Sequence, residues 1–200
     1  MKNVLSTTFG LLLLSAAVMT QAADVVVKPL RGTIDSVQAD TLNFTTRAGQ
    51  HQSIALTDKT AIRSISKTSV DSIKAESFVG SAATVQPDGT LKALEVTVFE
   101  PSLKGSGEGH YGWENADGST GTMTNGTVGK LSNAKGHTLT VMYKGGEKQL
   151  VVPDDVPIAY VEPGSRDQLT AGAKIVLFPA EDGKSARGIA VGKNGFAPPM

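Results

Sequence analysis

Short runs in which hydrophobic and polar residues alternate recur along the chain from about residue 30 onward. Residues 33–37, 42–45 and 53–56 are such runs. Because successive side chains of a strand point to opposite faces, this alternation predicts strands with one face on a core and one face in water. The pattern therefore indicates an all-β protein.

Turn signals between these runs predict how the strands are connected. Ala48-Gly49 and Gly145-Gly146 lie between alternating runs and predict hairpin turns. Residues 70–74 and 166–169 each predict one short helical turn before the strands resume. Three strands, a helical turn and two strands is the order of a small Greek-key barrel of the OB type. A further strand at 61–65 leaves a six-stranded barrel as an alternative.

The same order of signals occurs twice in the chain. Gly32-Thr33-Ile34 corresponds to Gly126-Thr127-Val128, and residues 54–58 correspond to 150–154. Matches in the same order with small insertions are the signature of a duplicated module. We therefore expect an all-β fold of two tandem small OB-like Greek-key β-barrels, joined by a Gly-rich connector, after an N-terminal signal peptide.

The expected organisation has five parts. These are a signal peptide at 1–22, a first barrel at 23–100, a connector at 101–125, a second barrel at 126–193 and a tail at 194–200. The first core is expected to hold Ile34, Leu42, Phe44, Ile54, Leu56, Ile62, Phe78, Val96 and Val98. The second is expected to hold Val128, Leu139, Val141, Leu150, Val152, Ile158, Val176 and Phe178.

The first 22 residues have the organisation of a secretory signal peptide. Lys2 gives a positive start, residues 9–18 are a hydrophobic run, and Thr20-Gln21-Ala22 supplies small residues at the expected cleavage site. The hydrophobic run is shorter than the roughly 20 residues that a membrane-spanning helix needs. We expect export to the periplasm as a soluble protein with no transmembrane span.

Composition excludes several classes of function. The chain has 19 basic and 19 acidic residues, and this balance argues against nucleic acid as a partner, since phosphate binding needs an excess of Lys and Arg. There is no Cys, which excludes disulfides, thiol nucleophiles and Cys-based metal sites. The 22 Gly residues fit a turn-rich β protein.

The Gly-rich connector at 101–125 contains the only Trp of the chain, Trp113, close to Tyr111 and Glu114. In one interpretation the two aromatic side chains pack between the barrels and fix their relative orientation. In the other, the connector is a binding loop, in which Gly lets the backbone approach a ligand and the aromatic rings stack on it. Tyr111, Trp113 and Glu114 are the candidate ligand- or partner-binding residues.

The same connector offers candidate metal ligands. Glu108 and His110 flank Gly109, and His137 begins a predicted strand of the second barrel. Imidazole and carboxylate are suitable ligands for Zn or Cu. Glu108, His110 and His137 are therefore the candidate metal site, although their spacing matches no established motif.

Signatures of catalysis are absent from the sequence. No Gly-x-Ser-x-Gly elbow precedes a helix, and Gly105-Ser106-Gly107 lacks that context. The acidic pair Asp154-Asp155 lies at a predicted turn, where carboxylates hydrogen-bond the backbone. We expect no enzyme activity and no cofactor, with Zn or Cu as the ions of the alternative hypothesis.

Several short segments resemble a known family. Gly107-Glu108-Gly109-His110, Trp113-Glu114, the run at 123–128 and the ending at 191–200 are similar to a family of uncharacterised proteobacterial periplasmic proteins with a domain of unknown function. The resemblance covers essentially the whole chain after the signal peptide. It implies an OB-like β-barrel and no established activity.

These observations favour an exported, non-enzymatic binding or interaction protein that presents the connector to a partner. The expected partner is an unknown periplasmic protein, a glycan or a small molecule. The alternative is a periplasmic metal-binding protein that uses the loop of Glu108 and His110.

Overall fold

The computed structural model describes residues 26–132 and 137–200, and these form an all-β molecule. The predicted signal peptide at 1–22 lies outside the described residues. The strands of the first half are β1 (Leu30–Gln38), β2 (Thr41–Thr46), β3 (His51–Ala55), β4 (Ala61–Thr68), β5 (Phe78–Val85), β6 (Leu91–Ala93) and β7 (Val96–Phe99). Those of the second half are β8 (Gly109–Glu114), β9 (Thr120–Ser132), β10 (His137–Tyr143), β11 (Gly146–Val152), β12 (Ile158–Pro163), β13 (Lys174–Pro179) and β14 (Ala186–Gly192).

The helical elements within these ranges are single 3-10 turns. They are η1 (Val70–Ser72), η2 (Pro101–Leu103), η3 (Arg166–Gln168) and η4 (Lys193–Gly195). The two helical turns expected at 70–74 and 166–169 are present as η1 and η3. No helix in the described ranges has the length and apolar character needed to cross a membrane.

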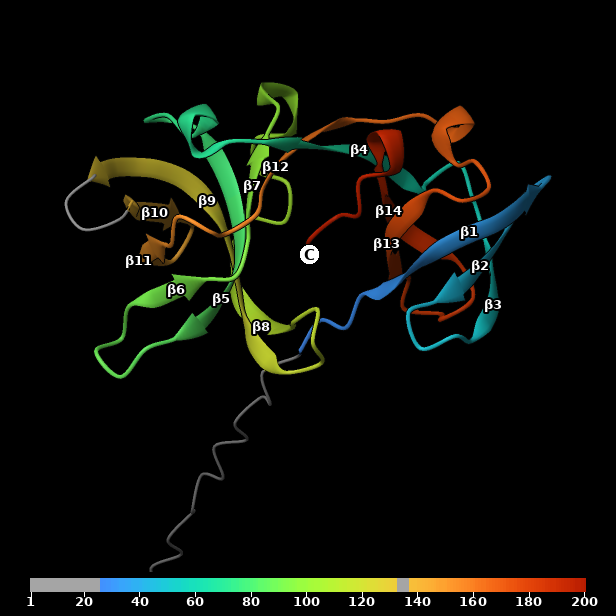
Figure 1. Cartoon of the computed structure of the whole chain (residues 1–200), viewed down its shortest axis with the longest axis horizontal. Helices are drawn as coiled ribbons and strands as arrows, with labels where there is room; N and C mark the ends of the chain where they lie inside the picture. Colours follow the sequence, from blue (N-terminus) through green and yellow to red (C-terminus); the bar gives the residue numbers. More distant parts are fainter. Residues whose placement is uncertain (1–25, 133–136) are drawn as a thin grey trace, which may run out of the picture.

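The strands pair into one continuous sheet. On the left of Figure 1 this sheet forms a closed barrel of five strands, called the left barrel, and on the right five further strands curl into a second unit, called the right barrel. In the left barrel β5 pairs with β6, β6 with β11, β11 with β10, β10 with β9 and β9 again with β5. This ring of five strands is closed. β7 and β8 are added to it, through β5 and β9 respectively.

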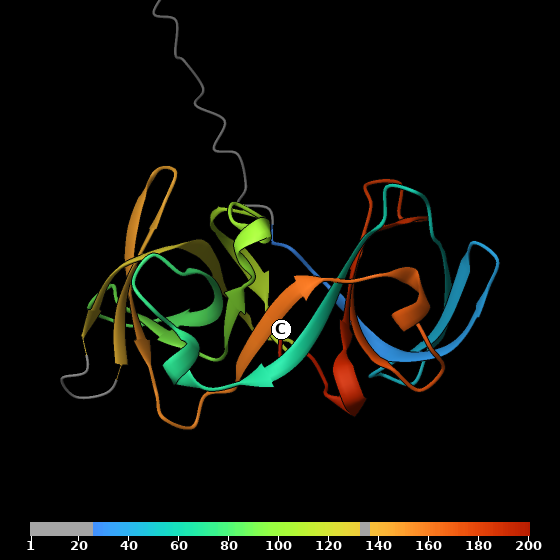
Figure 2. The ribbon, with the colours of Figure 1, turned by 90° about the horizontal axis from the view of Figure 1, so that it is seen from above.

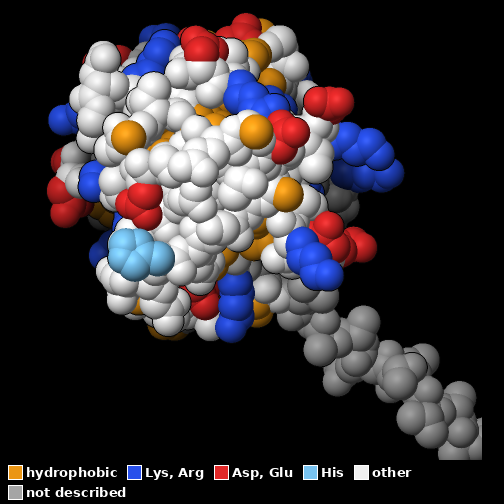
Figure 3. Space-filling model, turned by 90° about the vertical axis from the view of Figure 1, so that its right-hand side faces the viewer, with side chains coloured by type: hydrophobic (Ala, Val, Ile, Leu, Met, Phe, Trp, Pro, Cys, Tyr) orange, Lys and Arg blue, Asp and Glu red, His pale blue; other side chains and the backbone are white. Residues whose placement is uncertain are grey.

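The right barrel is built from β3, β2, β1, β13 and β14, in that order. Its two edges meet at a bridge between Ala55 and Ser185, where the Ala55 amide donates a hydrogen bond to the Lys184 carbonyl. Figure 3 views the molecule from this side: positive and negative side chains are interspersed, and hydrophobic side chains are exposed singly.

Each barrel contains strands from both halves of the sequence, which differs from the expected barrels at 23–100 and 126–193. The right barrel combines β1–β3 with β13 and β14, and the left barrel combines β9–β11 with β5 and β6. Alternation along a strand determines which side chains face a core, but it does not specify the neighbouring strand. The hydrophobic pattern therefore could not show that strands of one half of the sequence pair with strands of the other half.

Strands β4 and β12 carry the chain between the two barrels. They run antiparallel side by side there (Figure 2). β4 also pairs with β14, and β12 also pairs with β7. Ile65 of β4 lies opposite Val161 of β12 at the middle of this crossing. The strand expected at 61–65 therefore exists, and it connects the two barrels.

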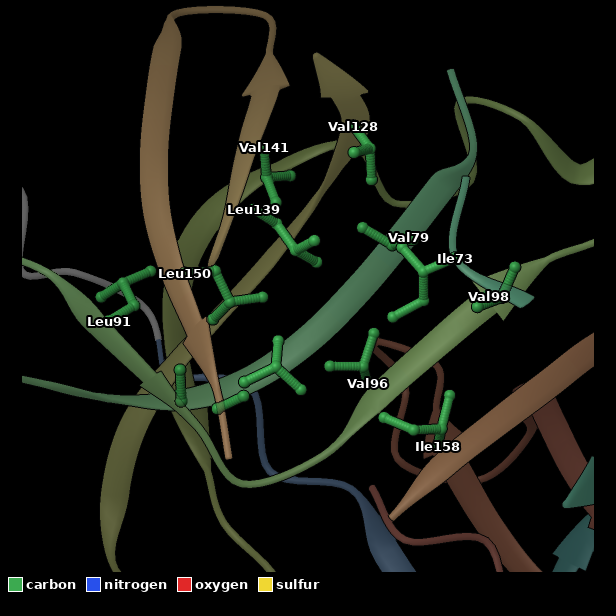
Figure 4. Packing of buried hydrophobic residues seen from close by; sticks show 13 residues of the cluster. Ile73, Val79, Leu91, Val96, Val98, Val128, Leu139, Val141, Leu150 and Ile158 are labelled. Atoms are coloured by element: carbon green, nitrogen blue, oxygen red, sulfur yellow. The ribbon is translucent and has the colours of Figure 1, made fainter. Parts of the chain in front are cut away.

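The cores follow the exchanged pairing. In the left barrel Val79, Val96 and Val98 pack in one cluster with Leu139 and Leu150. Figure 4 shows Val79, Val96, Leu139 and Leu150 around a common interior. The first-half residues Val96 and Val98 thus fill a core with second-half strands, contrary to the expected assignment.

The right barrel shows the reciprocal arrangement. Ile34, Leu42 and Phe44 pack with Ile175 and Leu177 of the second half. A third cluster surrounds the crossing of β4 and β12. It contains Val176 and Phe178, which the sequence had placed in the second core.

The segment expected to be a connector at 101–125 contains the β8–β9 hairpin, which extends the left barrel. Gly121 lies in β9, where a Cβ atom would come within 2.6 Å of the Ala83 carbonyl oxygen. This glycine allows close approach of two strands and does not mark a flexible loop. The high Gly content concealed the alternation of the hairpin.

Gly32 and Gly126, which correspond in the sequence comparison, have similar surroundings in the two barrels. A Cβ atom at Gly32 would lie 2.4 Å from the Thr45 carbonyl oxygen, and one at Gly126 would lie 2.3 Å from the Met142 carbonyl oxygen. Both positions sit where a neighbouring backbone crosses too closely for any side chain.

We expect Gly126→Ala to lower the free energy of unfolding by about 1–3 kcal/mol, because the backbone of β10 must move to admit the methyl group. Gly188→Ala is the matched control, since its Cβ atom would meet its nearest neighbour at an ordinary 3.5 Å. Urea unfolding of the two variants measures the difference. Equal loss of stability in both would contradict the steric account of Gly126.

Candidate functional site

The β8–β9 hairpin places Trp113 against the opposite barrel. Trp113 is only 3% exposed and packs with Ala82 and Met123. Its ring centroid lies 6.1 Å from that of Phe178, which belongs to β13 of the right barrel. Trp113 therefore contacts both barrels, as the packing interpretation of the connector expects.

Tyr111 lies on the same face of β8 and is half-buried. Its hydroxyl accepts a hydrogen bond of 3.0 Å from the Asn125 side-chain amide, which also donates to the Gly107 carbonyl at 2.9 Å. Burial raises the pKa of Tyr111 above its ordinary value. These bonds hold the turn before β8 against the hairpin.

A cavity of about 300 Å³ lies between the barrels. Its walls come from β4, β12, β13 and β14 together with β5, β7, β8 and β9. The aromatic and Met side chains that line it are Tyr111, Trp113, Phe99, Phe178, Met123 and Met200. Apolar cavities of this size, with a few polar groups, are typical of small-molecule sites.

The cavity is formed by the outer faces of the barrel strands. In β7, Val96 and Val98 point into the left core, and Thr97 and Phe99 line the cavity. Glu95, immediately before β7, continues the cavity-facing alternation. Alternate side chains of β7 thus face the core of the left barrel on one side and the cavity on the other.

Glu95 is the buried acidic group of this site, with only 2% of its surface exposed. One carboxylate oxygen accepts a hydrogen bond of 2.9 Å from the Ala82 amide, and the other accepts one of 2.9 Å from the Thr97 hydroxyl. Removal from water raises the pKa of Glu95 from 4.5 to about 7, and the two hydrogen bonds and Arg31 only partly oppose that effect.

Arginine residues lie around the cavity. Arg63 and Arg187 line it, the first half-buried and the second exposed. Arg31 is buried close by and donates hydrogen bonds to the main-chain oxygens of Met200 at 2.6 Å and Glu114 at 2.7 Å. Arg31 thus ties the end of β8 to the segment that follows η4.

Trp113 also carries an unsatisfied donor. Its indole nitrogen is buried and has no hydrogen-bond acceptor among the described residues. A buried donor without a partner costs about 1–3 kcal/mol relative to a satisfied one. An acceptor supplied from outside the described residues would recover that free energy.

The other predicted binding residue, Glu114, lies at the end of β8. Its backbone amide donates a hydrogen bond to the Val27 carbonyl, and its backbone carbonyl accepts one from the Arg31 guanidinium. Its carboxylate lies 3.8 Å from the exposed Lys28 ammonium. Glu114 is absent from the lining of the cavity. The structure therefore brings Tyr111 and Trp113 to one site and gives Glu114 a different set of contacts.

The candidate metal ligands occupy separate environments. A Glu108 carboxylate oxygen accepts a hydrogen bond from the Lys144 amide, and His110 Nδ1 lies 2.8 Å from the Thr124 hydroxyl. Burial, and to a smaller extent Lys148, lower the pKa of His110. In the part of the chain that the structure describes, no three His, Asp or Glu side chains form a group that could hold a metal ion. Glu108, His110 and His137 are accordingly not gathered into one site.

Sequence reasoning missed Glu95 and Phe178 as site residues. Glu95 was detectable as a lone acidic residue at the start of the hydrophobic run Val96-Thr97-Val98-Phe99. Phe178 gave no such signal, because its role depends on the exchange of strands between the barrels.

Comparisons with protein-family models, with curated proteins and with solved structures found no match.

Proposed function

We propose that this chain is a binding protein that holds a small, largely apolar organic molecule in the cavity between its two barrels. The observation that carries the proposal is the cavity itself, about 300 Å³ in volume and walled by Trp113, Phe178 and Phe99 from both barrels. Burial of apolar surface against these rings would supply the affinity. The proposal includes no chemical step.

A small molecule is favoured over the other expected partners by the form of the site. A glycan requires many exposed polar groups, whereas most of the large side chains that line this cavity are aromatic or aliphatic, with Glu95, Arg63 and Arg187 as the charged ones. A protein partner requires an exposed surface, whereas Trp113 is buried. No observation on the described residues favours the metal-binding alternative.

The sequence also bears on the cellular compartment and the evolutionary origin of the chain. We infer that the chain is exported to the periplasm by its first 22 residues and that it arose by duplication of an OB-like module. The similar surroundings of Gly32 and Gly126 support the duplication.

Trp113 provides the means to test binding. We expect 2-phenylethanol, a small aromatic probe, to change the fluorescence of Trp113 saturably with one-to-one stoichiometry. Ala61 lines the cavity, so Ala61→Leu should fill part of it and weaken binding about tenfold or more.

Ala48→Leu is the matched control, because Ala48 is exposed in the β2–β3 turn of the right barrel. This control should bind as the unchanged protein does. Binding that Ala61→Leu and Ala48→Leu affect equally, or no saturable response at all, would overturn the proposed site.

A further inference from the structure

We propose that the molecule held in the cavity is an organic cation, an amine or quaternary ammonium on an apolar body, whose charge pairs with Glu95. This inference rests on the proposed function and specifies the chemical class of its ligand.

Glu95 is the first reason for this assignment. Glu95 lines the cavity, and among the described residues its carboxylate accepts hydrogen bonds from two neutral donors, the Ala82 amide and the Thr97 hydroxyl. No basic side chain of the described residues forms an ion pair with it. A buried carboxylate without a cation is strongly unfavourable, and an entering cation would compensate it.

The aromatic lining is the second reason. Rings of Trp113, Tyr111, Phe99 and Phe178 surround the same cavity as the carboxylate. The face of an aromatic ring attracts a cation, and the attraction increases where water is excluded. A positively charged group would therefore meet favourable partners on several walls, whereas an anion would meet the negative faces of these rings.

The charged and titratable groups around Glu95 come from four other elements. They are Arg31 of β1, Arg63 of β4, Tyr111 of β8 and Arg187 of β14. Arg31 donates hydrogen bonds to the main-chain oxygens of Met200 and Glu114, and among the influences that lower the pKa of Glu95 it is the smallest. Arg187 is exposed and Arg63 half-exposed, so water and salt screen both from the cavity interior.

Protonation of Glu95 should control the binding of a cation. Burial raises the pKa of Glu95 to about 7, so the carboxyl is largely neutral below that pH and charged above it. An alkyl amine keeps its proton throughout this range. The affinity for a cation should therefore increase as the pH rises through about 7, and the affinity for a neutral analogue should change little.

The experiment compares three probes of similar shape: 2-phenylethylamine, 2-phenylethanol and 3-phenylpropionate. Calorimetric titrations of the full-length mature chain at pH 6, 7 and 8 measure each affinity. We expect the amine to bind about tenfold or more tightly than the alcohol at pH 8. At pH 6 the ratio of the two affinities should be roughly a fifth or less of its value at pH 8.

Glu95→Gln keeps the size of the side chain and removes its charge. It should abolish both the preference for the amine and its pH dependence, while the alcohol binds within about twofold of its original affinity. Glu147→Gln, an exposed position on β11, is the matched control and should change neither. The pH dependence in the unchanged protein needs no variant and remains decisive if Glu95→Gln folds poorly.

The outcomes separate the two proposals. An amine that binds no more tightly than the alcohol, or a preference that survives Glu95→Gln, would overturn the cation assignment and leave the cavity as a binding site. Tightest binding of 3-phenylpropionate would also overturn it, in favour of an anion held by Arg63 and Arg187. Failure of all three probes to bind would overturn the proposed function.

Discussion

Two fragments made by dividing the chain between Lys104 and Gly105 are expected to fold only when they are mixed. Each barrel takes strands from both sides of this point, so the single fragments 26–104 and 105–200 both lack strands needed to close a ring. The cut falls in an exposed turn where Gly105 has a φ of +88° and no atoms near its missing Cβ, so it removes no packing. Equimolar mixing should restore one cooperative thermal transition and a one-to-one complex.

Circular dichroism and gel filtration of each fragment provide the measurement. A single fragment should show no cooperative unfolding as a monomer, because strands that expose an apolar face and an unpaired edge are not stable alone. The intact chain cut at the same bond after folding is the control and should retain its transition. A monomeric fragment that unfolds cooperatively would contradict the exchanged pairing.

Replacement of Glu95 by Gln should change how stability depends on pH. The folded state raises the pKa of Glu95 from 4.5 to about 7, so between these values the folded chain keeps a proton that the unfolded chain has released. Stability from this group is therefore complete below about pH 4.5 and is lost progressively as the pH rises to about 7. The total loss is roughly 3 kcal/mol at and above that pH.

The measurement is urea unfolding of both proteins between pH 4.5 and 8. Glu95→Gln should lack this loss and be more stable than the unchanged protein above pH 7. Taking the difference between the two proteins removes the opposite contribution of His110, whose pKa is lowered by burial. Asp88, Asp117 and Asp182 have lowered pKa values and act below this window. A constant difference across the range would refute the buried, protonated state of Glu95.

The strands and turns of this molecule could be predicted from its sequence because they depend on local patterns. The runs at 33–37 and 42–45 lie within β1 and β2, and the turn at Ala48-Gly49 joins β2 to β3. The helical turns at 70–74 and 166–169 are present as η1 and η3. Alternation and turn residues act within a few positions, so no knowledge of distant partners was needed.

The pairing of strands between the halves could not be predicted in the same way. Val96 alternates correctly for a strand in either barrel, and only its contact with Val128 and Leu139 shows which core it fills. The similar order of signals in the two halves adds to this ambiguity, because the alternation of a strand fits a partner from either half. Two self-contained barrels and two exchanged barrels have the same hydrophobic pattern.

Two of the residues that line the cavity could be singled out from the sequence. Trp113 and Tyr111 stood out as aromatic residues in a Gly-rich segment, and both line the cavity. Their surroundings were misjudged, because Gly121 marks a close approach of strands and the segment forms a hairpin. Glu95 was missed because its burial and its hydrogen bond to the Ala82 amide of β5 depend on how the strands pack, which the local pattern does not show.

A crystal structure of the chain with 2-phenylethanol tests most directly the claim that the cavity between the barrels is a binding site. The account predicts the probe in the cavity, in contact with Trp113 and Phe178 from the two barrels. A probe bound only elsewhere on the molecule, with the cavity between the barrels unoccupied, would contradict it.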